Sequence, residues 1–169
     1  MERRQGSGPR SAGVEVNWPF LFGFTNALAL AGWLMLALLP RGPKLFSAVM
    51  YGCVAILCLA YAILFMLLFG DVVDSGRVAG AAAPNLGDYS VAGLRPLFAS
   101  DGGIVLGWTH YLAFDLFIGL WIAKDADHKG FSRMVQLPFL FATLMAGPIG
   151  LLAWLATREA RARRAAKAA

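Results

Sequence analysis

Four long apolar stretches, at 18–39, 45–69, 104–123 and 135–156, are separated by short polar turns and by one long connection. A helix needs about 20 mostly apolar residues to cross the hydrocarbon core of a bilayer. Each stretch meets that length. The pattern predicts an all-α integral membrane protein with four transmembrane helices and a long loop, 70–103, between the second and the third.

The composition agrees with the membrane class. The chain of 169 residues is 59% hydrophobic and 15% charged, whereas soluble domains have about 25% charged residues. The net charge of +5 comes from basic residues near the two ends and in short turns. This distribution suits lipid headgroups and does not indicate nucleic-acid binding. We divide the chain into a disordered polar leader (1–17), a membrane domain (18–156) and a basic tail (157–169).

Four spans would place both termini and the long loop on one side of the membrane. Ten Lys and Arg residues fall on that side and five on the other, which predicts cytoplasmic termini because cytoplasmic loops are enriched in these residues. Within the long loop, Leu94, Leu97 and Phe98 alternate with small residues. We expect a short helix over 91–99 that lies at the membrane interface or caps the bundle.

The third stretch contains an ionisable residue at depth. Asp115 lies about 11 residues into it, or about 17 Å along a helix. An acid near the bilayer centre costs about 2.5–3.5 kcal/mol on insertion scales, so it should face other helices and have a partner. Helical steps of three and four place Trp108 and Tyr111 on the same face as Asp115. A functional acid and a hydrogen-bonded structural acid both fit this pattern.

His110 lies about 140° away from Asp115 around the helix. It could reach a substrate or an acid from a neighbouring helix, or it could bond to a backbone carbonyl near the helix start. Cys53 and Cys58 do not have the spacing of a redox pair or a metal site, and the charged turn around Asp125, Asp127 and His128 is better explained as solvated. We therefore expect no metal and no cofactor.

Two further residues are candidates for substrate binding together with Trp108. Asn26, in the first stretch, could contact Asp115 across helices or serve helix packing. Pro148, in "MAGPIGLL", removes a backbone hydrogen bond and predicts a kink in the fourth helix. Carbonyls freed at membrane depth are tolerated where they are buried or line a cavity, so the kink either makes room for a ligand or serves packing. Gln136 is expected at the interface.

The run "GWTHYLAFDLFIGLWIAKDA" resembles the signature of the abscisic-acid-deficient-4-like membrane proteins, the neoxanthin synthase family. "LFASDGG" and "GPIGLL" are compatible with the same family, whose resemblance extends over all four stretches. It implies a redox-neutral opening of a xanthophyll epoxide to an allenic alcohol, without an organic cofactor. This chemistry needs a base and an acid, and the matching candidates are His110 and Asp115, with Tyr111 as a further proton donor.

The leading hypothesis from the sequence is a carotenoid- or isoprenoid-modifying isomerase. The alternative is a non-catalytic membrane protein that binds a pigment or assists assembly. The Ala- and Arg-rich ends indicate a bacterial protein, which predicts an inner-membrane location. The expected partners are membrane lipid and an apolar isoprenoid or carotenoid ligand. The sequence identifies no protein partner.

Overall fold

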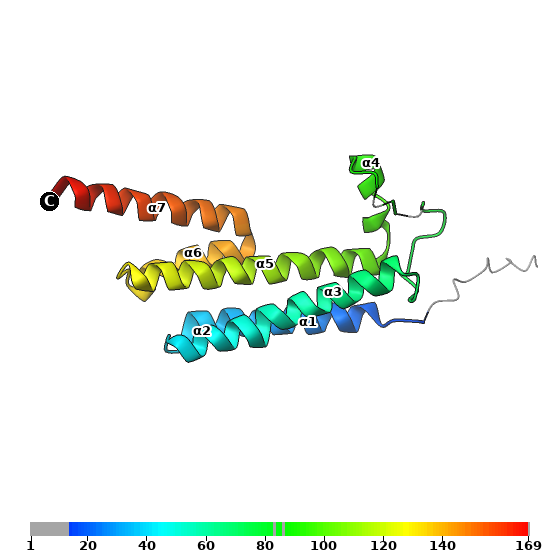
Figure 1. The fold of residues 1–169 in the computed structure, drawn as a ribbon, viewed down its shortest axis with the longest axis horizontal. Coiled ribbons are helices and arrows are strands. Elements are labelled where there is room, and N and C mark those ends of the chain that lie inside the picture. The colour runs from blue at the N-terminus through cyan, green and yellow to red at the C-terminus, as the bar shows by residue number, and fades with distance from the viewer. Residues whose placement is uncertain (1–13, 83, 86, 169) are drawn as a thin grey trace, which may run out of the picture.

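The computed structural model describes residues 14–168, except residues 83 and 86. The first 13 residues of the expected disordered leader therefore lie outside the described part. Helices account for most of the described chain (Figure 1). In order they are α1 (Trp18–Leu38), α2 (Pro43–Val49), the π-helical η1 (Met50–Val54), α3 (Ala55–Phe69), α4 (Val91–Leu94), the 3-10 helix η2 (Leu97–Ala99), α5 (Asp101–His128), α6 (Arg133–Met145) and α7 (Gly147–Ala168).

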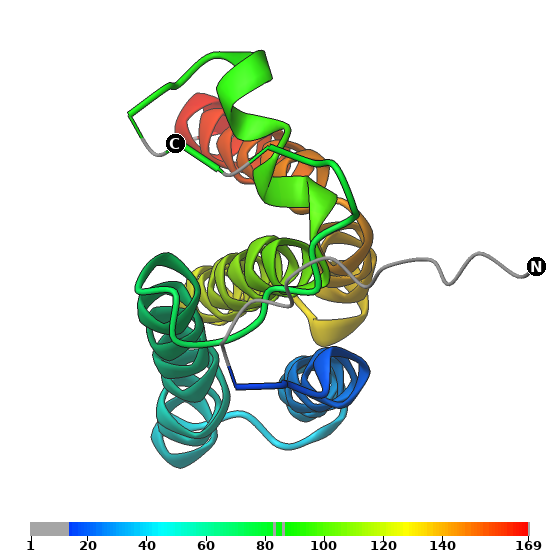
Figure 2. The ribbon, with the colours of Figure 1, turned by 90° about the vertical axis from the view of Figure 1, so that its right-hand side faces the viewer.

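Three helical segments are long and apolar enough to cross a membrane: α1, the continuous run Pro43–Phe69 formed by α2, η1 and α3, and α5. They correspond to the first three predicted spans. Seen along the bundle, α5 lies in the middle, with α1 and α3 on one side and α6 and α7 on the other (Figure 2). Because α5 contacts α1, α3 and α6, its faces carry most of the core.

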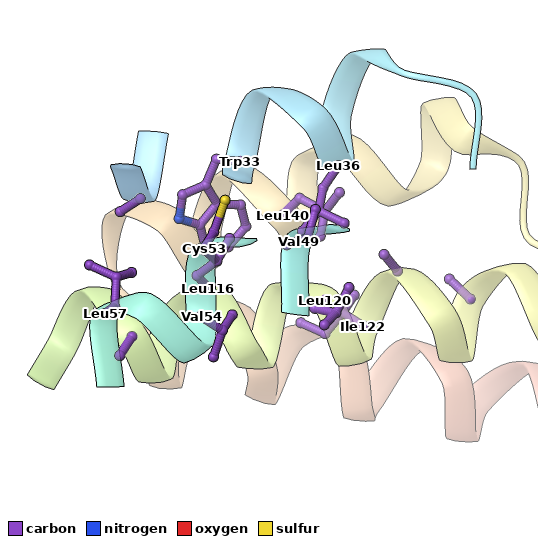
Figure 3. Close-up of a cluster of buried hydrophobic side chains, with 14 of the residues drawn as sticks. Trp33, Leu36, Val49, Cys53, Val54, Leu57, Leu116, Leu120, Ile122 and Leu140 are labelled. Carbon is purple, nitrogen blue, oxygen red and sulfur yellow. The ribbon is translucent and has the colours of Figure 1, made fainter. Parts of the chain in front are cut away.

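Glycines allow α1 and α5 to approach closely. A Cβ at Gly32 would lie 3.1 Å from Cδ1 of Leu116, and one at Gly119 would lie 3.2 Å from Cζ2 of Trp33. Small residues at helix interfaces permit this packing in membranes, where no hydrophobic effect drives two helices together. Leu36, Leu57, Leu116 and other buried side chains fill the space between the helices (Figure 3).

The predicted fourth span is not a single helix. α6 ends at Met145, Ala146 is non-helical with φ −158° and ψ 81°, and α7 then runs back along α6. Three residue pairs show that the two helices are antiparallel. Gly150 packs against Thr143, the Trp154 ring centre lies 5.5 Å from that of Phe139, and the Arg161 guanidinium lies 4.2 Å from the centre of the Phe131 ring. α6 and α7 therefore form a hairpin, and Figure 1 shows its tip near the middle of α5.

The sequence explains why the chain reverses here. Pro148 cannot donate an i→i−4 hydrogen bond, so it does not fit the interior of a continuous helix. It instead occupies the first turn of α7, a position that proline favours. Gly150 lets the second arm lie directly against Thr143. With 13 residues, α6 is about 20 Å long, which is shorter than the hydrocarbon core of about 30 Å.

The hairpin changes the expected topology. The start of α1 and the end of α7 lie at opposite ends of the bundle (Figure 1), whereas four full spans would bring them to the same end. We call the end with segment 70–100 the loop end. The other end, which holds residues 39–42, residues 129–132 and the last turns of α7, is the hairpin end.

The hairpin also changes how the Lys and Arg residues are divided between the two ends of the bundle. Five Lys and Arg residues belong to the leader or to the long connection, and the other ten belong to the hairpin end. The tail 157–168, predicted as a separate segment, continues α7.

The long connection is held to the start of α5. Trp18 Nε1 donates to the Asp74 carbonyl at 3.1 Å, and Gly102 N donates to the Ser75 carbonyl at 2.9 Å. Val14 pairs with Val73 as an isolated bridge, which ties the residues before α1 to the same end. The two short helices α4 and η2 occupy the region where one helix over 91–99 was predicted.

The hairpin predicts a labelling pattern in membrane vesicles. Cysteines replacing Tyr89, His128 or Arg163, one at a time in a cysteine-free background, are all at exposed positions. A membrane-impermeant maleimide should label Arg163→Cys from the same side as His128→Cys and from the side opposite to Tyr89→Cys. If the reagent labelled Arg163→Cys and Tyr89→Cys from the same side, the four-span topology would be correct and the hairpin wrong.

Candidate functional site

A cavity of about 260 Å³ lies where the hairpin tip meets the middle of α5. Trp33 of α1, four residues of α5 and residues 144–148 line it; the α5 residues are Trp108, Tyr111, Leu112 and Asp115. Trp108, Tyr111 and Asp115 share a face because they are separated by three and four residues. The structure thus brings together four residues that the sequence singled out: these three and Pro148.

Asp115 lies against the first residue of α7. A Cβ at Gly147 would come within 2.7 Å of the Asp115 Cγ and closer still to Oδ1, so only glycine leaves the carboxyl group this space. The first backbone N–H groups of a helix lack intrahelical partners, and the helix dipole favours negative charge at this end. The break between α6 and α7 therefore brings the positive end of a helix to a carboxyl group in the middle of the bundle.

The cavity opens towards the outer face of the bundle. The Tyr111 side chain is 61% exposed and that of Trp108 is 44% exposed, while Asp115 is half-buried. Within the described residues, neither the Asp115 carboxyl group nor the Tyr111 hydroxyl group forms a side-chain hydrogen bond. Both groups are thus available to a ligand that enters from the membrane.

Asn26 contributes to the cavity indirectly, through the side chain of Trp108. Its Oδ1 accepts a hydrogen bond of 3.1 Å from Trp108 Nε1, and its Nδ2 donates to the Phe22 carbonyl at 2.7 Å. Of the two roles considered for Asn26, contact with Asp115 or helix packing, the structure shows a contact between helices, with Trp108. Asn26 thereby fixes the indole of Trp108, which lines the cavity.

His110 lies on another face of α5, as its position in the helix predicts. Its ring stacks on Phe114 at 4.6 Å and lies 5.5 Å from the Tyr61 ring of α3. It does not line the cavity. The structure therefore does not bring His110 and Asp115 together.

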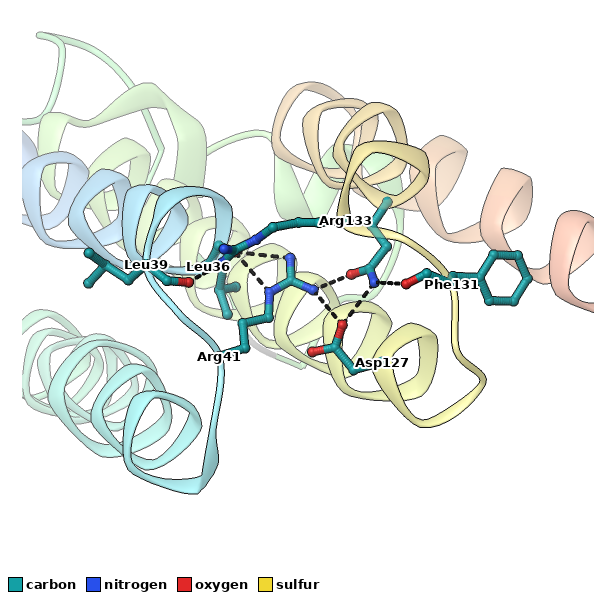
Figure 4. Close-up of polar contacts among 7 residues, drawn as sticks. Leu36, Leu39, Arg41, Asp127, Phe131 and Arg133 are labelled. Carbon is teal, nitrogen blue, oxygen red and sulfur yellow. Dashed lines mark hydrogen bonds and ion pairs between the residues drawn. The ribbon is translucent and has the colours of Figure 1, made fainter.

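A second polar cluster, which the sequence did not predict, lies at the hairpin end (Figure 4). Arg41 forms an ion pair with Asp127 at 3.0 Å and a hydrogen bond with Gln136. Gln136, expected at the interface, is fully buried and donates to both Asp127 and the Phe131 carbonyl at 2.8 Å. Burial lowers the pKa of the Arg41 guanidinium, and Asp127 opposes that effect.

This cluster joins three elements. Arg41 and Arg133 both donate to the Leu36 carbonyl, and Arg133 also donates to the Leu39 carbonyl. The last carbonyls of a helix have no intrahelical partners, and basic side chains stabilise them. The end of α1 is thereby tied to the end of α5 and to the start of the hairpin.

Asp125 forms a neighbouring set of contacts. It accepts a hydrogen bond of 3.1 Å from Trp154 Nε1, pairs with Arg158 at 3.4 Å and also pairs with Lys129. The charged turn is therefore a structural connection between α5 and α7. Over the part of the chain that the structure describes, no group of three His, Cys, Asp or Glu side chains could hold a metal ion.

Taken together, the three candidate spans found among the described residues indicate a helical membrane protein. The hairpin tip and the half-buried Asp115 carboxyl group form a recess beside the middle of α5. The family model described as ABA DEFICIENT 4-like matches residues 20–154. The chain belongs to this family, in agreement with the resemblance carried by the third stretch. No curated protein and no solved structure matches it.

The hairpin-end cluster predicts a stability effect. Gln136→Leu removes a buried amide from Arg41 and Asp127 and leaves them with incomplete hydrogen bonding, which costs about 1–3 kcal/mol. The apparent melting temperature in detergent should fall by several degrees. Met134→Leu, on the exposed face of the same helix, serves as the control and should change little. Equal melting temperatures for both variants would refute a stabilising role of this cluster.

Proposed function

We propose that this protein is a redox-neutral isomerase of carotenoid or isoprenoid substrates in which Asp115 transfers the proton. The observation that supports it best is a carboxyl group, in a cavity at the middle of the bundle, that forms no side-chain hydrogen bond with the residues that the structure describes. Ionisable groups at membrane depth are costly and commonly functional. Membership of the ABA DEFICIENT 4-like family supports the choice of substrate class.

The reaction requires two proton transfers and no electron transfer. Opening an epoxide to an allenic alcohol removes one proton from carbon, breaks one carbon–oxygen bond and adds one proton to oxygen. The Asp115 carboxylate would take the carbon-bound proton, and a proton donor would supply the oxygen. The proton taken up by Asp115 then restores that donor, so the overall reaction is an isomerisation.

Tyr111 is the donor that the geometry supports. It lies one helical turn before Asp115 and lines the same cavity, whereas His110 is stacked among aromatic rings on another face. The acid–base pair proposed here is therefore Asp115 and Tyr111. Trp33 and Trp108 provide apolar walls, which favour proton transfer by limiting access of water.

The cavity size suits one end of a long ligand. Pockets for drug-sized ligands occupy about 300–1,000 Å³, and this cavity has about 260 Å³. It has room for an oxygenated end ring but not for a whole carotenoid. The ring would lie between Trp33 and the hairpin tip, with the reacting oxygen near Tyr111 and Asp115.

The charge distribution supports a location in a bacterial inner membrane with the hairpin end in the cytoplasm. Ten of the fifteen Lys and Arg residues belong to that end. In this orientation the start of α1 and the long connection lie on the outer side. A ligand would reach Asp115 laterally from the bilayer.

Asp115→Asn should lower the rate of product formation at least 100-fold, because general acid–base groups contribute about 10²–10⁴-fold. The test compares carotenoid extracts of cells that express each variant with a deletion strain, after membrane insertion has been verified. Tyr111→Phe should also lower the rate. His110→Phe, which preserves an aromatic ring at the stacked position, should retain it.

Two outcomes would contradict the proposal. Full conversion by Asp115→Asn would exclude the catalytic role of this acid. Unchanged pigments in the deletion strain, together with pigment copurifying with the wild-type protein, would favour the non-catalytic pigment-binding alternative.

A further inference from the structure

The face of α5 that carries Asp115 changes character along its length. Towards the hairpin end, Ile122 and Ala126 on this face are completely buried. Towards the loop end, Tyr111, Trp108 and Ile104 on the same face are 61%, 44% and 47% exposed. The change occurs at Asp115, beside the hairpin tip, because α6 and α7 cover only one half of the face.

Side chains of neighbouring elements flank the exposed half, and we call the strip Ile104, Trp108 and Tyr111 between them the groove. On one side the Phe22 ring of α1 lies 5.9 Å from the Trp108 ring, and Asn26 holds the same indole. At the loop end, Phe98 of η2 covers Gly107, where a Cβ would lie 2.9 Å from its ring. At the other end, Met145 and Pro148 of the hairpin tip close the groove and form the cavity.

The length of the groove follows from the helix. Ile104 and Asp115 are 11 positions apart, or about 16 Å along the helix axis. The groove is continuous with the cavity, because Trp108 and Tyr111 belong to both. A rod-shaped apolar chain parallel to α5 would therefore extend from an end group beside Asp115 towards the loop end.

The side chains in the groove are unusual for a surface that contacts only lipid tails. Trp and Tyr concentrate at the two membrane interfaces, yet Tyr111 lies ten positions into α5, is exposed, and lines the same cavity as the half-buried Asp115. Polar groups at such depth usually face protein, ligand or water. The aromatic rings of the groove suit the apolar chain of a ligand. The polar groups of Tyr111 and Asp115 at one end of the groove suit an oxygenated end of that ligand.

We propose that this groove, lined by Ile104, Trp108, Tyr111 and Phe98, binds the chain of a long isoprenoid or polyene whose oxygenated end ring enters the Asp115 cavity. This inference rests on the proposed function for the choice of ligand class. It adds that the chain lies along α5 in the half of the bilayer that the hairpin leaves open. Binding should therefore depend on residues far from the reacting atoms.

The test uses the purified full chain in lipid nanodiscs and two probes. Zeaxanthin is a long carotenoid with hydroxylated end rings, and β-ionone represents an isolated end ring. Binding is measured by quenching of tryptophan fluorescence for zeaxanthin and by competition or calorimetry for β-ionone. Ile104→Trp fills the groove away from Asp115, and Leu59→Trp places the same ring on the exposed face of α3 as a matched control.

Ile104→Trp should weaken zeaxanthin binding at least tenfold, which corresponds to a loss of about 1.4 kcal/mol or more of binding free energy. The affinity for β-ionone should stay within about twofold of the wild-type value. Leu59→Trp should alter neither. The inference is overturned if Ile104→Trp leaves zeaxanthin binding unchanged, if it weakens both probes equally, or if the wild-type protein binds no zeaxanthin. A wild-type protein that binds zeaxanthin, loses that binding in Ile104→Trp and converts no pigment would contradict the proposed function and not the groove.

Discussion

The structure depends on one constraint: a chain that reverses inside a membrane must satisfy or shield its backbone polar groups there. The reversal at Ala146 meets this constraint because it is packed against α5 and lines a cavity. The Ala146 carbonyl accepts hydrogen bonds from Ile149 N at 2.9 Å and Gly150 N at 3.2 Å. The first residues of α7 then face Asp115, so the break and the acid belong to the same feature of the fold.

The charged residues at the hairpin end and Asp115 at the middle of the bundle have different surroundings. At the hairpin end, carboxylates are paired with arginine, lysine, glutamine or tryptophan side chains and hold α1, α5, α6 and α7 together. At mid-depth, Asp115 has a helix start beside it and an open cavity in front of it. Ion pairs that join the ends of several helices serve structure, whereas an acid that faces a cavity can serve chemistry.

Helical periodicity was sufficient to predict three spans and the separation of Asp115 from His110, because both follow from local spacing along one helix. It could not predict the hairpin. Pro148 indicates a break, but whether the chain continues or turns back depends on contacts such as Trp154 with Asp125, which join residues 29 positions apart. The same limit applies to Gln136, whose burial results from pairing with Arg41 across the bundle. Asn26 was singled out as a candidate partner of Asp115, but the side chain that it contacts is Trp108.

The most direct test of this account is the membrane depth of successive residues in 135–156. Nitroxide labels at successive lipid-facing positions report depth through the ratio of their collisions with oxygen and with a water-soluble nickel complex. The hairpin predicts that depth increases to a maximum near Ala146 and then decreases again towards Ala156. A depth that passes from one membrane surface through the centre to the other surface would contradict the hairpin, and with it the placement of α7 beside Asp115.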